Sequence, residues 1–277
     1  MEEVSVFLKD LIGKTVSGSS LFRRNRLKEY LQILVLDFIY SHPKYGELIF
    51  YGGSCLAHCH GLPRLSEDLD FVDARGKINV QTLADDLENH FGKETDLTVK
   101  TTTQKFGIYL KFPILRELSL AGQSESDLLF LKIEVYRSFG FCKSYKIEIV
   151  PLFKFNRSLL IRTLDLSTLM STKIRAVLHR KWEKTDREGK TLAKVKGRDY
   201  FDLMWYLEKG VTPNMNCIED VKDAAALREK LLEIVDKVDS KSIQVDLDAL
   251  IDDEHYIRNV SKNIKEILKR DITRAIQ

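Results

Sequence analysis

Two glycines and a serine stand out as residues whose types and spacing could do chemistry. A short apolar run ends at Tyr51 and is followed directly by Gly52, Gly53 and Ser54. Glycines let a ligand approach the backbone closely, and the amides at the start of a helix point toward an anion. This segment therefore predicts a phosphate-binding turn between a strand and a helix, to which Ser54 adds a hydroxyl donor.

A pair of aspartates follows this turn. Asp68 and Asp70 are separated by one leucine, and Asp68 comes fifteen residues after Gly53. Residues i and i+2 of a strand point to the same face, so the two carboxylates would lie side by side. Such groups repel each other unless a cation lies between them, and their hard oxygen atoms suit Mg²⁺ or Mn²⁺. Turn and aspartates together predict a metal site that also binds substrate phosphates.

The elements that must position these residues are mixed α and β up to about residue 164 and helical afterwards. Periodicity of two or short apolar runs predict strands, and apolar residues at helical spacing predict helices. Strands are expected at 47–51, 69–72, 97–103, 106–112, 128–136 and 145–150, and helices at 21–40, 54–60, 80–90, 168–182, 195–207, 219–238 and 256–273. The predicted fold class is α+β, with a core domain over residues 1–164 and a helical domain over residues 165–277.

Composition excludes several classes of protein. The net charge of +3, from 44 Lys and Arg against 41 Asp and Glu, is too small to indicate nucleic-acid binding by itself. The beginning of the chain is acidic and lacks an apolar segment, and no stretch is long and apolar enough to span a bilayer. The four cysteines follow no disulfide spacing pattern. These features predict a cytoplasmic protein without a membrane partner.

The motifs resemble those of a known family. Gly-Ser followed by Asp-x-Asp resembles the signature of the polymerase-β-like nucleotidyltransferase superfamily, and the string from Arg64 to Phe71 is similar to the AbiEii/AbiGii toxins of toxin–antitoxin systems. Farther along, the segments 173–180 and 198–202 resemble that family's Lys-x-x-Ala-x-x-x-Arg helix and its Arg-Asp-x-x-Asp motif. The matching motifs lie roughly between residues 50 and 208.

The resemblance implies a fold and an activity. The fold would be a mixed sheet with flanking helices, followed by a carboxyl-terminal helical domain that completes the active site. The activity would be transfer of a nucleoside monophosphate from an NTP to an acceptor hydroxyl, with release of pyrophosphate. The family suggests the 3′ end of tRNA as acceptor, Mg²⁺ or Mn²⁺ as cofactor and an antitoxin as protein partner.

The resemblance also implies roles for individual residues. The expected metal ligands are Asp68 and Asp70, the expected nucleotide-binding residues are Gly53, Ser54, Lys173 and Arg180, and the expected catalytic residues are Asp68, Asp70, Glu134, Lys173 and Asp199. A third carboxylate on a neighbouring strand is usual in the superfamily, where it acts as a base on the attacking hydroxyl. Two similar strings offer Glu134 and Glu148 for this role. We expect Glu134, because it follows a long apolar strand.

Several residues have simpler interpretations that stay open. Lys173 and Arg180 could lie on a solvated helix face. Asp202, three residues after Asp199, could serve the structure as well as the reaction, with Arg198 as its ion-pair partner. A zinc site in the segment 55–60, which contains two cysteines and two histidines, lacks a second half elsewhere.

Other functions also remain open. The chain could bind a nucleotide and act by occupancy or through a partner, or it could transfer the nucleotide to a small molecule or a protein.

Overall fold

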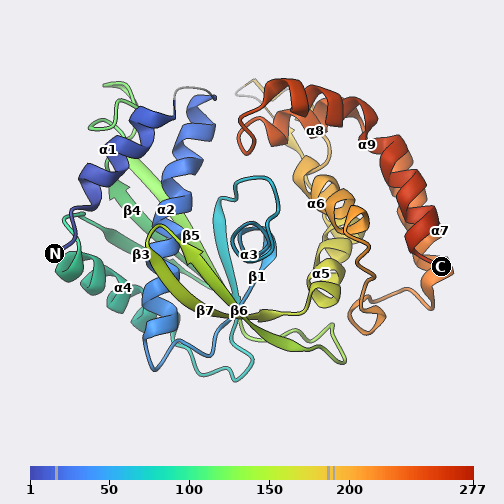
Figure 1. Cartoon of the computed structure of the whole chain (residues 1–277), viewed down its shortest axis with the longest axis horizontal. Helices are drawn as coiled ribbons and strands as arrows, with labels where there is room; N and C mark the ends of the chain where they lie inside the picture. The colour runs from blue at the N-terminus through green and yellow to red at the C-terminus, as the bar shows by residue number, and fades with distance from the viewer. Residues whose placement is uncertain (16–17, 186–187, 190) are drawn as a thin grey trace. The chain divides into compact units, whose positions relative to one another are not determined.

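The structure is a computed structural model that describes residues 1–15, 18–185, 188–189 and 191–277. Contacts within the chain divide it into two compact units, which can be followed by colour in Figure 1. The first unit consists of Met1–Phe139 and Glu148–Thr163, and the second of Gly140–Ile147 and Leu164–Gln277. The domain boundary predicted after residue 164 stays a prediction. The segment Gly140–Ile147 groups with the second unit, although it lies earlier in the chain.

The first unit is built on a mixed sheet, as the fold-class prediction expected. The strand order is β3-β4-β5-β2-β1-β7-β6. The strands are β1 (Ile49–Tyr51), β2 (Asp68–Val72), β3 (Lys100–Gln104), β4 (Gly107–Pro113), β5 (Leu128–Tyr136), β6 (Ile147–Lys154) and β7 (Arg157–Leu164). Strand β2 pairs in parallel with β5 and antiparallel with β1, whereas β4 pairs antiparallel with both β3 and β5. Strand β2 therefore lies at the centre of the sheet, between β1 and β5.

The helices of the first unit are α1 (Val4–Lys14), α2 (Ser20–Ser41), α3 (Gly52–Cys59) and α4 (Val80–Glu94). Helix α2 begins where the Ser19 side chain accepts a hydrogen bond from the Phe22 amide, and it ends just before His42-Pro43. Helix α4 begins in the same way, with Asn79 accepting from the Thr82 amide. Helix α2 contacts β5, and α4 contacts β3 and β4.

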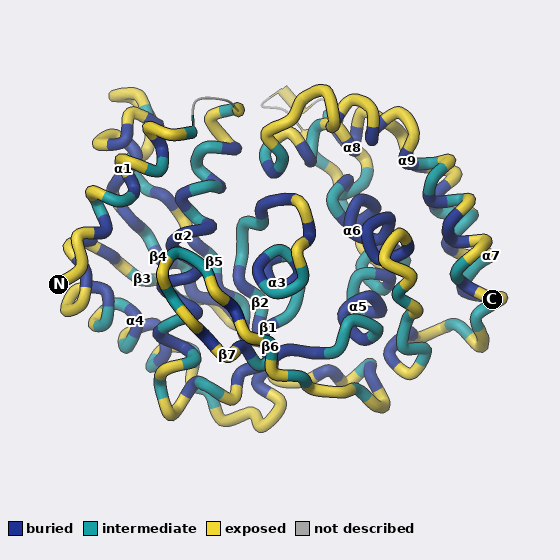
Figure 2. The backbone as a smooth tube through the Cα atoms, viewed as in Figure 1, coloured by how far each residue is buried: buried dark blue, intermediate teal, exposed yellow. Residues whose placement is uncertain are grey.

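Side chains alternate along the central strands, so that only one face of the sheet is fully buried. On β5, Leu129, Leu131, Ile133 and Val135 are buried, and the residues between them are not. The Phe91 ring of α4 meets the Phe112 ring of β4 at 5.5 Å, so the helices lie against the buried face. The opposite face is called the half-exposed sheet face below, and its residues include Asp68, Asp70, Tyr109, Lys111, Phe130, Lys132, Glu134 and Tyr136. The alternation is visible in Figure 2.

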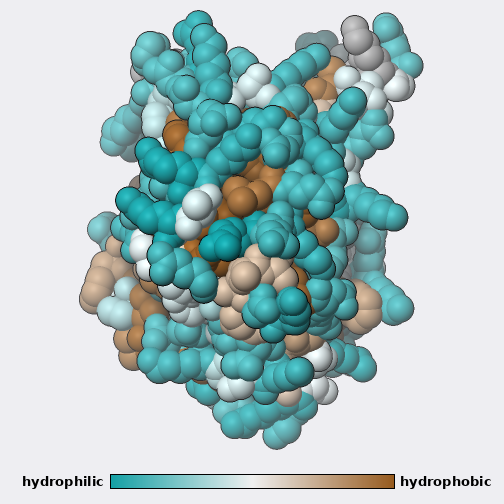
Figure 3. All heavy atoms as spheres, turned by 90° about the vertical axis from the view of Figure 1, so that its right-hand side faces the viewer, coloured by the Kyte–Doolittle hydropathy of each residue, from teal (hydrophilic) through white to brown (hydrophobic). Residues whose placement is uncertain are grey.

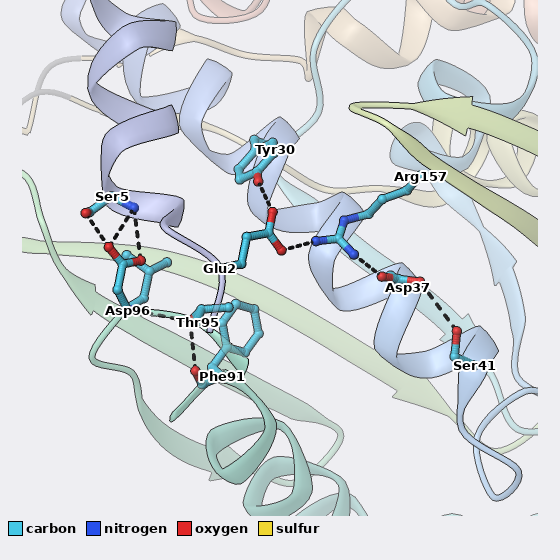
Figure 4. Close-up of polar contacts among 10 residues, drawn as sticks. Glu2, Ser5, Tyr30, Asp37, Ser41, Phe91, Thr95, Asp96 and Arg157 are labelled. Carbon is cyan, nitrogen blue, oxygen red and sulfur yellow. Dashed lines mark hydrogen bonds and ion pairs between the residues drawn. The ribbon is translucent and has the colours of Figure 1, made fainter. Parts of the chain in front are cut away.

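An ion-pair network attaches the beginning of the chain to the first unit (Figure 4). The Arg157 guanidinium, at the start of β7, donates to the carboxylates of Glu2 and of Asp37 on α2. The Tyr30 hydroxyl donates to Glu2 at 3.0 Å. Ser5 donates from its amide and its hydroxyl to Asp96. Residues distant in the sequence therefore hold α1, α2 and β7 together.

The second unit is mainly helical, with α5 (Leu166–His179), α6 (Gly197–Glu208), η1 (Met215–Cys217), α7 (Ala224–Asp236), α8 (Ser240–Leu247), α9 (Glu254–Ala275) and a short strand pair of β8 (Lys184–Thr185) with β9 (Thr191–Ala193). Helix α6 is its centre, because it contacts α5, α8 and α9. A Cβ at Gly197 would lie 2.6 Å from the Ile243 Cα, so the start of α6 packs backbone to backbone against α8.

Two further features bear on the expectations from sequence. Cys142 and Cys217 are paired as a disulfide in the second unit, a pairing that the spacing of the four cysteines did not predict. Within the part of the chain that the structure describes, no helix is both long and apolar enough to cross a membrane. The surface seen from the right-hand side of Figure 1 is mainly hydrophilic, with a smaller hydrophobic area near its middle (Figure 3).

Candidate active site

The paired aspartates lie on the half-exposed sheet face, where β2 carries them. Leu69 and Phe71 are fully buried on the opposite side of the strand, whereas Asp68 and Asp70 are only partly covered. The alternation that buries the two apolar residues therefore directs both carboxylates to the same face. Solvent, or a ligand, can reach them there.

Glu134 is brought next to these aspartates by the pairing of β5 with β2. The two strands are parallel, and the register places Glu134 opposite Asp70 and Lys132 opposite Asp68. Neighbouring strands lie about 5 Å apart, so the three carboxylates form one group. Glu148 lies on β6 at the edge of the sheet, separated from β2 by β1 and β7. This geometry supports Glu134 as the third carboxylate.

The Glu134 carboxylate is held by neighbours on its own strand. Lys132 Nζ lies 2.5 Å from one carboxylate oxygen, and the Tyr136 hydroxyl donates to the other at 3.1 Å. Partial burial would raise the pKa of Glu134, but the Lys132 ammonium and the hydrogen bonds outweigh it and hold the pKa below its ordinary value. Glu134 is therefore ionised at neutral pH and able to accept a proton.

The glycines of the predicted turn are required by their contacts with this group. Gly52 has φ of +81°, and a Cβ there would lie 2.4 Å from Asp70 Oδ2. A Cβ at Gly53 would lie 2.7 Å from Arg64 Nη2 and 3.0 Å from Ser66 Oγ. Side chains are thus excluded at both positions, and the Asp70 carboxylate lies against the first turn of α3.

Helix α3 itself begins at Gly52, two residues before the predicted start at Ser54. Its N-cap residue, Tyr51, makes no side-chain capping hydrogen bond. The amides of a first helical turn lack partners inside the helix, so a phosphate group could accept from them. This arrangement is consistent with the predicted role of Gly53, which stays a prediction.

Ser54 has a contact that the sequence did not indicate. It is fully buried, and its hydroxyl donates to the backbone carbonyl of Asp68. The contact ties α3 to β2 at the residue where the first aspartate stands. Ser54 therefore helps to position the strand that carries the carboxylates. To donate a hydrogen bond to a phosphate, as predicted, its hydroxyl would have to give up the bond to the Asp68 carbonyl, because it has one proton to donate.

Arg64 is a residue of this site to which sequence reasoning gave no role. It is buried, its Nη1 donates to the Leu65 carbonyl at 2.7 Å, and its Nη2 lies against the Gly53 backbone. Its guanidinium therefore lies beside the glycine turn that the sequence predicts to bind phosphate. Its place in the string next to Leu65 and Ser66 was the available signal.

The half-exposed sheet face offers part of a binding site for a divalent cation. Asp68 and Asp70 offer carboxylate oxygens on one face, and such a site is completed by phosphate oxygens of a nucleotide. Among the described residues, no group of three or more His, Cys, Asp or Glu side chains is arranged to hold a metal. Glu134 points to Lys132 instead. The same finding gives no support to a zinc site at 55–60, where Cys55 contacts Thr163 Oγ1 at 3.0 Å and His58 contacts Gln32 at 2.9 Å.

The second unit brings together the residues of the two downstream motifs. Lys173 Nζ, on α5, lies 2.9 Å from Asp199 Oδ1 and 2.7 Å from Asp202 Oδ2, both on α6. Arg180 Nη1 lies 2.6 Å from the other Asp199 oxygen. These residues are called the buried charge cluster below. The two carboxylates share one helix face, as their spacing of three residues predicted.

This buried charge cluster is closed to solvent except at Arg180, whose side chain keeps 38% of its exposure. The side chain of Asp202 is fully buried, and those of Asp199 and Lys173 keep 3% and 11% of their exposure. Burial would raise the pKa of Asp199, but Lys173 and Arg180 outweigh it and hold the pKa below its ordinary value. Asp202 therefore has a structural contact, with Lys173 as its partner. The catalytic role of Asp199, and the triphosphate contacts of Lys173 and Arg180, stay predictions.

Lys196 is a second residue of the second unit that sequence reasoning missed. It precedes α6 and is partly buried beside Arg180 and Arg198. Burial and these two like charges lower its pKa to about 8. Positive charge is thus concentrated around Asp199 to a degree that its own motif does not indicate.

The comparisons with known proteins agree with this geometry. A mixed sheet with a strand-to-helix glycine turn and neighbouring carboxylates is the arrangement that the sequence motifs predicted for a nucleotidyltransferase. The family model described as nucleotidyl transferase AbiEii toxin, Type IV TA system, matches residues 37–270. The chain therefore belongs to the AbiEii nucleotidyltransferase toxin family, and the resemblance inferred from its motifs is confirmed.

One of the matching solved structures shares the fold at low sequence identity. MenT4, a nucleotidyltransferase toxin from Mycobacterium tuberculosis H37Rv, matches with a TM-score of 0.51 and 12% identity, covering 98% of this chain and 97% of its own. JHP933 from Helicobacter pylori matches with a TM-score of 0.48 and 18% identity, covering 93% of this chain and 96% of its own. No curated protein sequence matches the chain. Membership in the family implies an NTP substrate and an antitoxin partner.

Proposed function

We propose that this toxin uses Mg²⁺ to transfer a nucleoside monophosphate from an NTP to the 3′ hydroxyl of an RNA of the tRNA class. The observation that carries the proposal is the register of β2 and β5, which places Glu134 opposite Asp70 and on the same sheet face as Asp68. A base beside two metal-binding carboxylates is the arrangement that nucleotidyl transfer needs.

The chemistry follows from what each group offers. The acceptor oxygen forms a bond to the α-phosphorus, and the bond from that phosphorus to the bridging oxygen breaks, so that pyrophosphate leaves. The proton of the acceptor hydroxyl goes to Glu134, whose carboxylate is ionised. Asp68 and Asp70 would hold the divalent cation, which would supply positive charge near the phosphate oxygens.

The half-exposed sheet face supports a nucleic-acid acceptor. Phe130 keeps 41% of its exposure, and Lys111 lies opposite it on β4. An exposed aromatic ring that can stack on a base, beside a lysine that can bind a phosphate, is typical of surfaces for single-stranded nucleic acid. A small-molecule acceptor would not need them.

The test is incubation of the purified chain with Mg²⁺, each of four α-labelled NTPs and total tRNA. We expect one NTP to label RNA, and we expect EDTA and Asp70→Asn to abolish the label. Asp85→Asn, which changes an aspartate of α4 that accepts from Gln81, is the matched control and should keep the activity.

Each result that contradicts the proposal identifies an alternative. Label on protein or on a small molecule would replace RNA as the acceptor. If the chain bound a nucleotide but released no pyrophosphate, it would act by holding the nucleotide and not by transferring it. Labelling that persists in EDTA would remove the metal from the proposal.

A further inference from the structure

Lys132 is a cation built into the carboxylate group of the first unit. It lies on β5 opposite Asp68, and its Nζ is 2.5 Å from Glu134 Oε1. Its electrostatic neighbours include Asp68 as well as Glu134. The ammonium therefore neutralises charge at the position where the third carboxylate would otherwise turn toward a metal.

Glu134 is fully engaged by this arrangement. One of its oxygens contacts Lys132, and the other accepts from the Tyr136 hydroxyl. Asp70, opposite it on β2, is a further hydrogen-bonding neighbour of this carboxylate. An ion that used Glu134 as a ligand would therefore have to compete with the Lys132 ammonium for its oxygens.

The surroundings keep the lysine in this place. Gly107 lies opposite Glu134 on β4, and a Cβ there would be in ordinary contact, at 3.8 Å, with the Lys132 Cε. The Tyr109 ring lies on the other side of the ammonium at 5.8 Å. A cation held between a carboxylate and an aromatic face is stabilised by both. Lys132 is therefore held by the Glu134 carboxylate and the Tyr109 ring, although its side chain keeps 30% of its exposure.

The charges of the group fit one divalent ion. Asp68 and Asp70 offer carboxylate oxygens to one ion, whereas the Glu134 carboxylate is already paired with the Lys132 ammonium. A second divalent ion beside Glu134 would lie next to the ammonium, where like charges a few ångströms apart repel strongly. The lysine would have to leave before such an ion could bind.

We propose that the Lys132 ammonium takes the place of a second divalent cation, so that the site binds one ion, on Asp68 and Asp70. Lys132 then acts as a positioning residue that orients Glu134 as the base. This inference rests on the proposed function, because it concerns the same carboxylates. A purely structural role of Lys132 would leave the number of bound ions unchanged when the lysine is replaced, whereas this proposal predicts that the number changes.

The experiment is a titration of the full chain with Mn²⁺ alone, in which free Mn²⁺ is measured by electron paramagnetic resonance. Ions bound elsewhere are subtracted with Asp70→Asn. We expect one site-specific ion in the native chain, one in Lys132→Arg, and two in Lys132→Met. Lys105→Met, which removes an exposed lysine that lies over the Phe106 ring, is the matched control and should keep one ion.

Two ions in the native chain, or none, would overturn the inference, and so would a single ion in Lys132→Met. The native count needs no variant, so the inference can fail even if Lys132→Met does not fold. RNA labelling with two native ions would leave the proposed function standing and remove this inference. One native ion without any transfer would do the opposite.

Discussion

The ion pair of Lys132 and Glu134 in the first unit keeps 30% and 24% of its side chains exposed, whereas Lys173 and Asp202 in the second unit keep 11% and 0%. Both groups combine a lysine with neighbouring carboxylates. The first lies on the half-exposed sheet face, which a ligand can reach. The charges of the second are satisfied by one another.

This is the difference that we expect between a site that binds a ligand and a cluster that holds two helices together. Partly exposed ion pairs contribute little to stability, because water screens them. A buried pair costs much to break, because the remaining partner keeps its charge without compensation. Motifs that look equally catalytic in the sequence are thus expected to respond differently to the same substitution.

The largest expected effect is on the stability of the second unit. Lys173→Met leaves the buried Asp199 and Asp202 without their common cation, and should lower the free energy of unfolding by about 3–5 kcal/mol. Lys132→Met, the matched substitution in the first unit, should lower it by about 1 kcal/mol or less. Urea denaturation of both variants measures the difference. Equal losses would remove the distinction between the two groups.

The next effect concerns catalysis in the first unit. Glu134→Gln removes the proton acceptor, and should lower kcat for RNA labelling by at least roughly 100-fold, about 2.7 kcal/mol of barrier. Its stability should change little. Glu148→Gln, on the edge strand β6, should keep the native rate. If the two variants exchanged these results, the third carboxylate would be Glu148.

A glycine comparison sharpens the geometry of the first unit. Gly52→Ala and Gly61→Ala both place a side chain at positive φ, +81° and +75°, and each should cost about 1–2 kcal/mol. Only the Cβ at Gly52 meets Asp70, whereas nothing lies within 4 Å of a Cβ at Gly61. Transfer activity should therefore be lost in Gly52→Ala and retained in Gly61→Ala. Similar activities in the two variants would show that Asp70 tolerates displacement.

The smallest expected effect is a pH dependence in the second unit. Lys196 has a pKa of about 8 in the folded chain, against 10.5 for an unperturbed lysine. Its burial as an ammonium therefore destabilises the fold below pH 8, and this cost is relieved as the pH rises toward 10.5. The full shift corresponds to about 3 kcal/mol, which solvent screening of this partly exposed lysine reduces, so the free energy of unfolding of the native chain minus that of Lys196→Met should increase by about 1 kcal/mol over this interval. A difference that stays constant would contradict the lowered pKa.

The sequence predicted much of the sheet and of the first site because alternation and glycine spacing are local signals. The strand at 128–136 was confirmed at both ends, and the helix at 21–40 within one residue at each end. Strand β7 was missed, because its exposed Leu160 hides the alternation. The helix expected from 219 begins at Ala224, because Asp223 caps it.

What the sequence could not predict depends on contacts between distant residues. The Glu134 register with Asp70 follows from the pairing of β5 with β2, which joins segments more than sixty residues apart. Lys132 was read only as part of a motif string, although its position between carboxylates follows from that register. The burial of Lys173 between two aspartates likewise depends on how α5 packs on α6.

The discontinuous course of the first unit has a consequence for anyone who cuts the gene into parts. Gly140–Ile147 belongs to the second unit, but the chain passes through it before returning for Glu148–Thr163. A single cut after residue 164 would therefore remove from the helical fragment eight residues that pack with it, including Cys142, the disulfide partner of Cys217. Such a fragment would lack part of its packing, and the surface of the helical unit that contacts residues 140–147 would be exposed to solvent. Separate production of the helical unit would require residues 140–147 to be grafted back onto it.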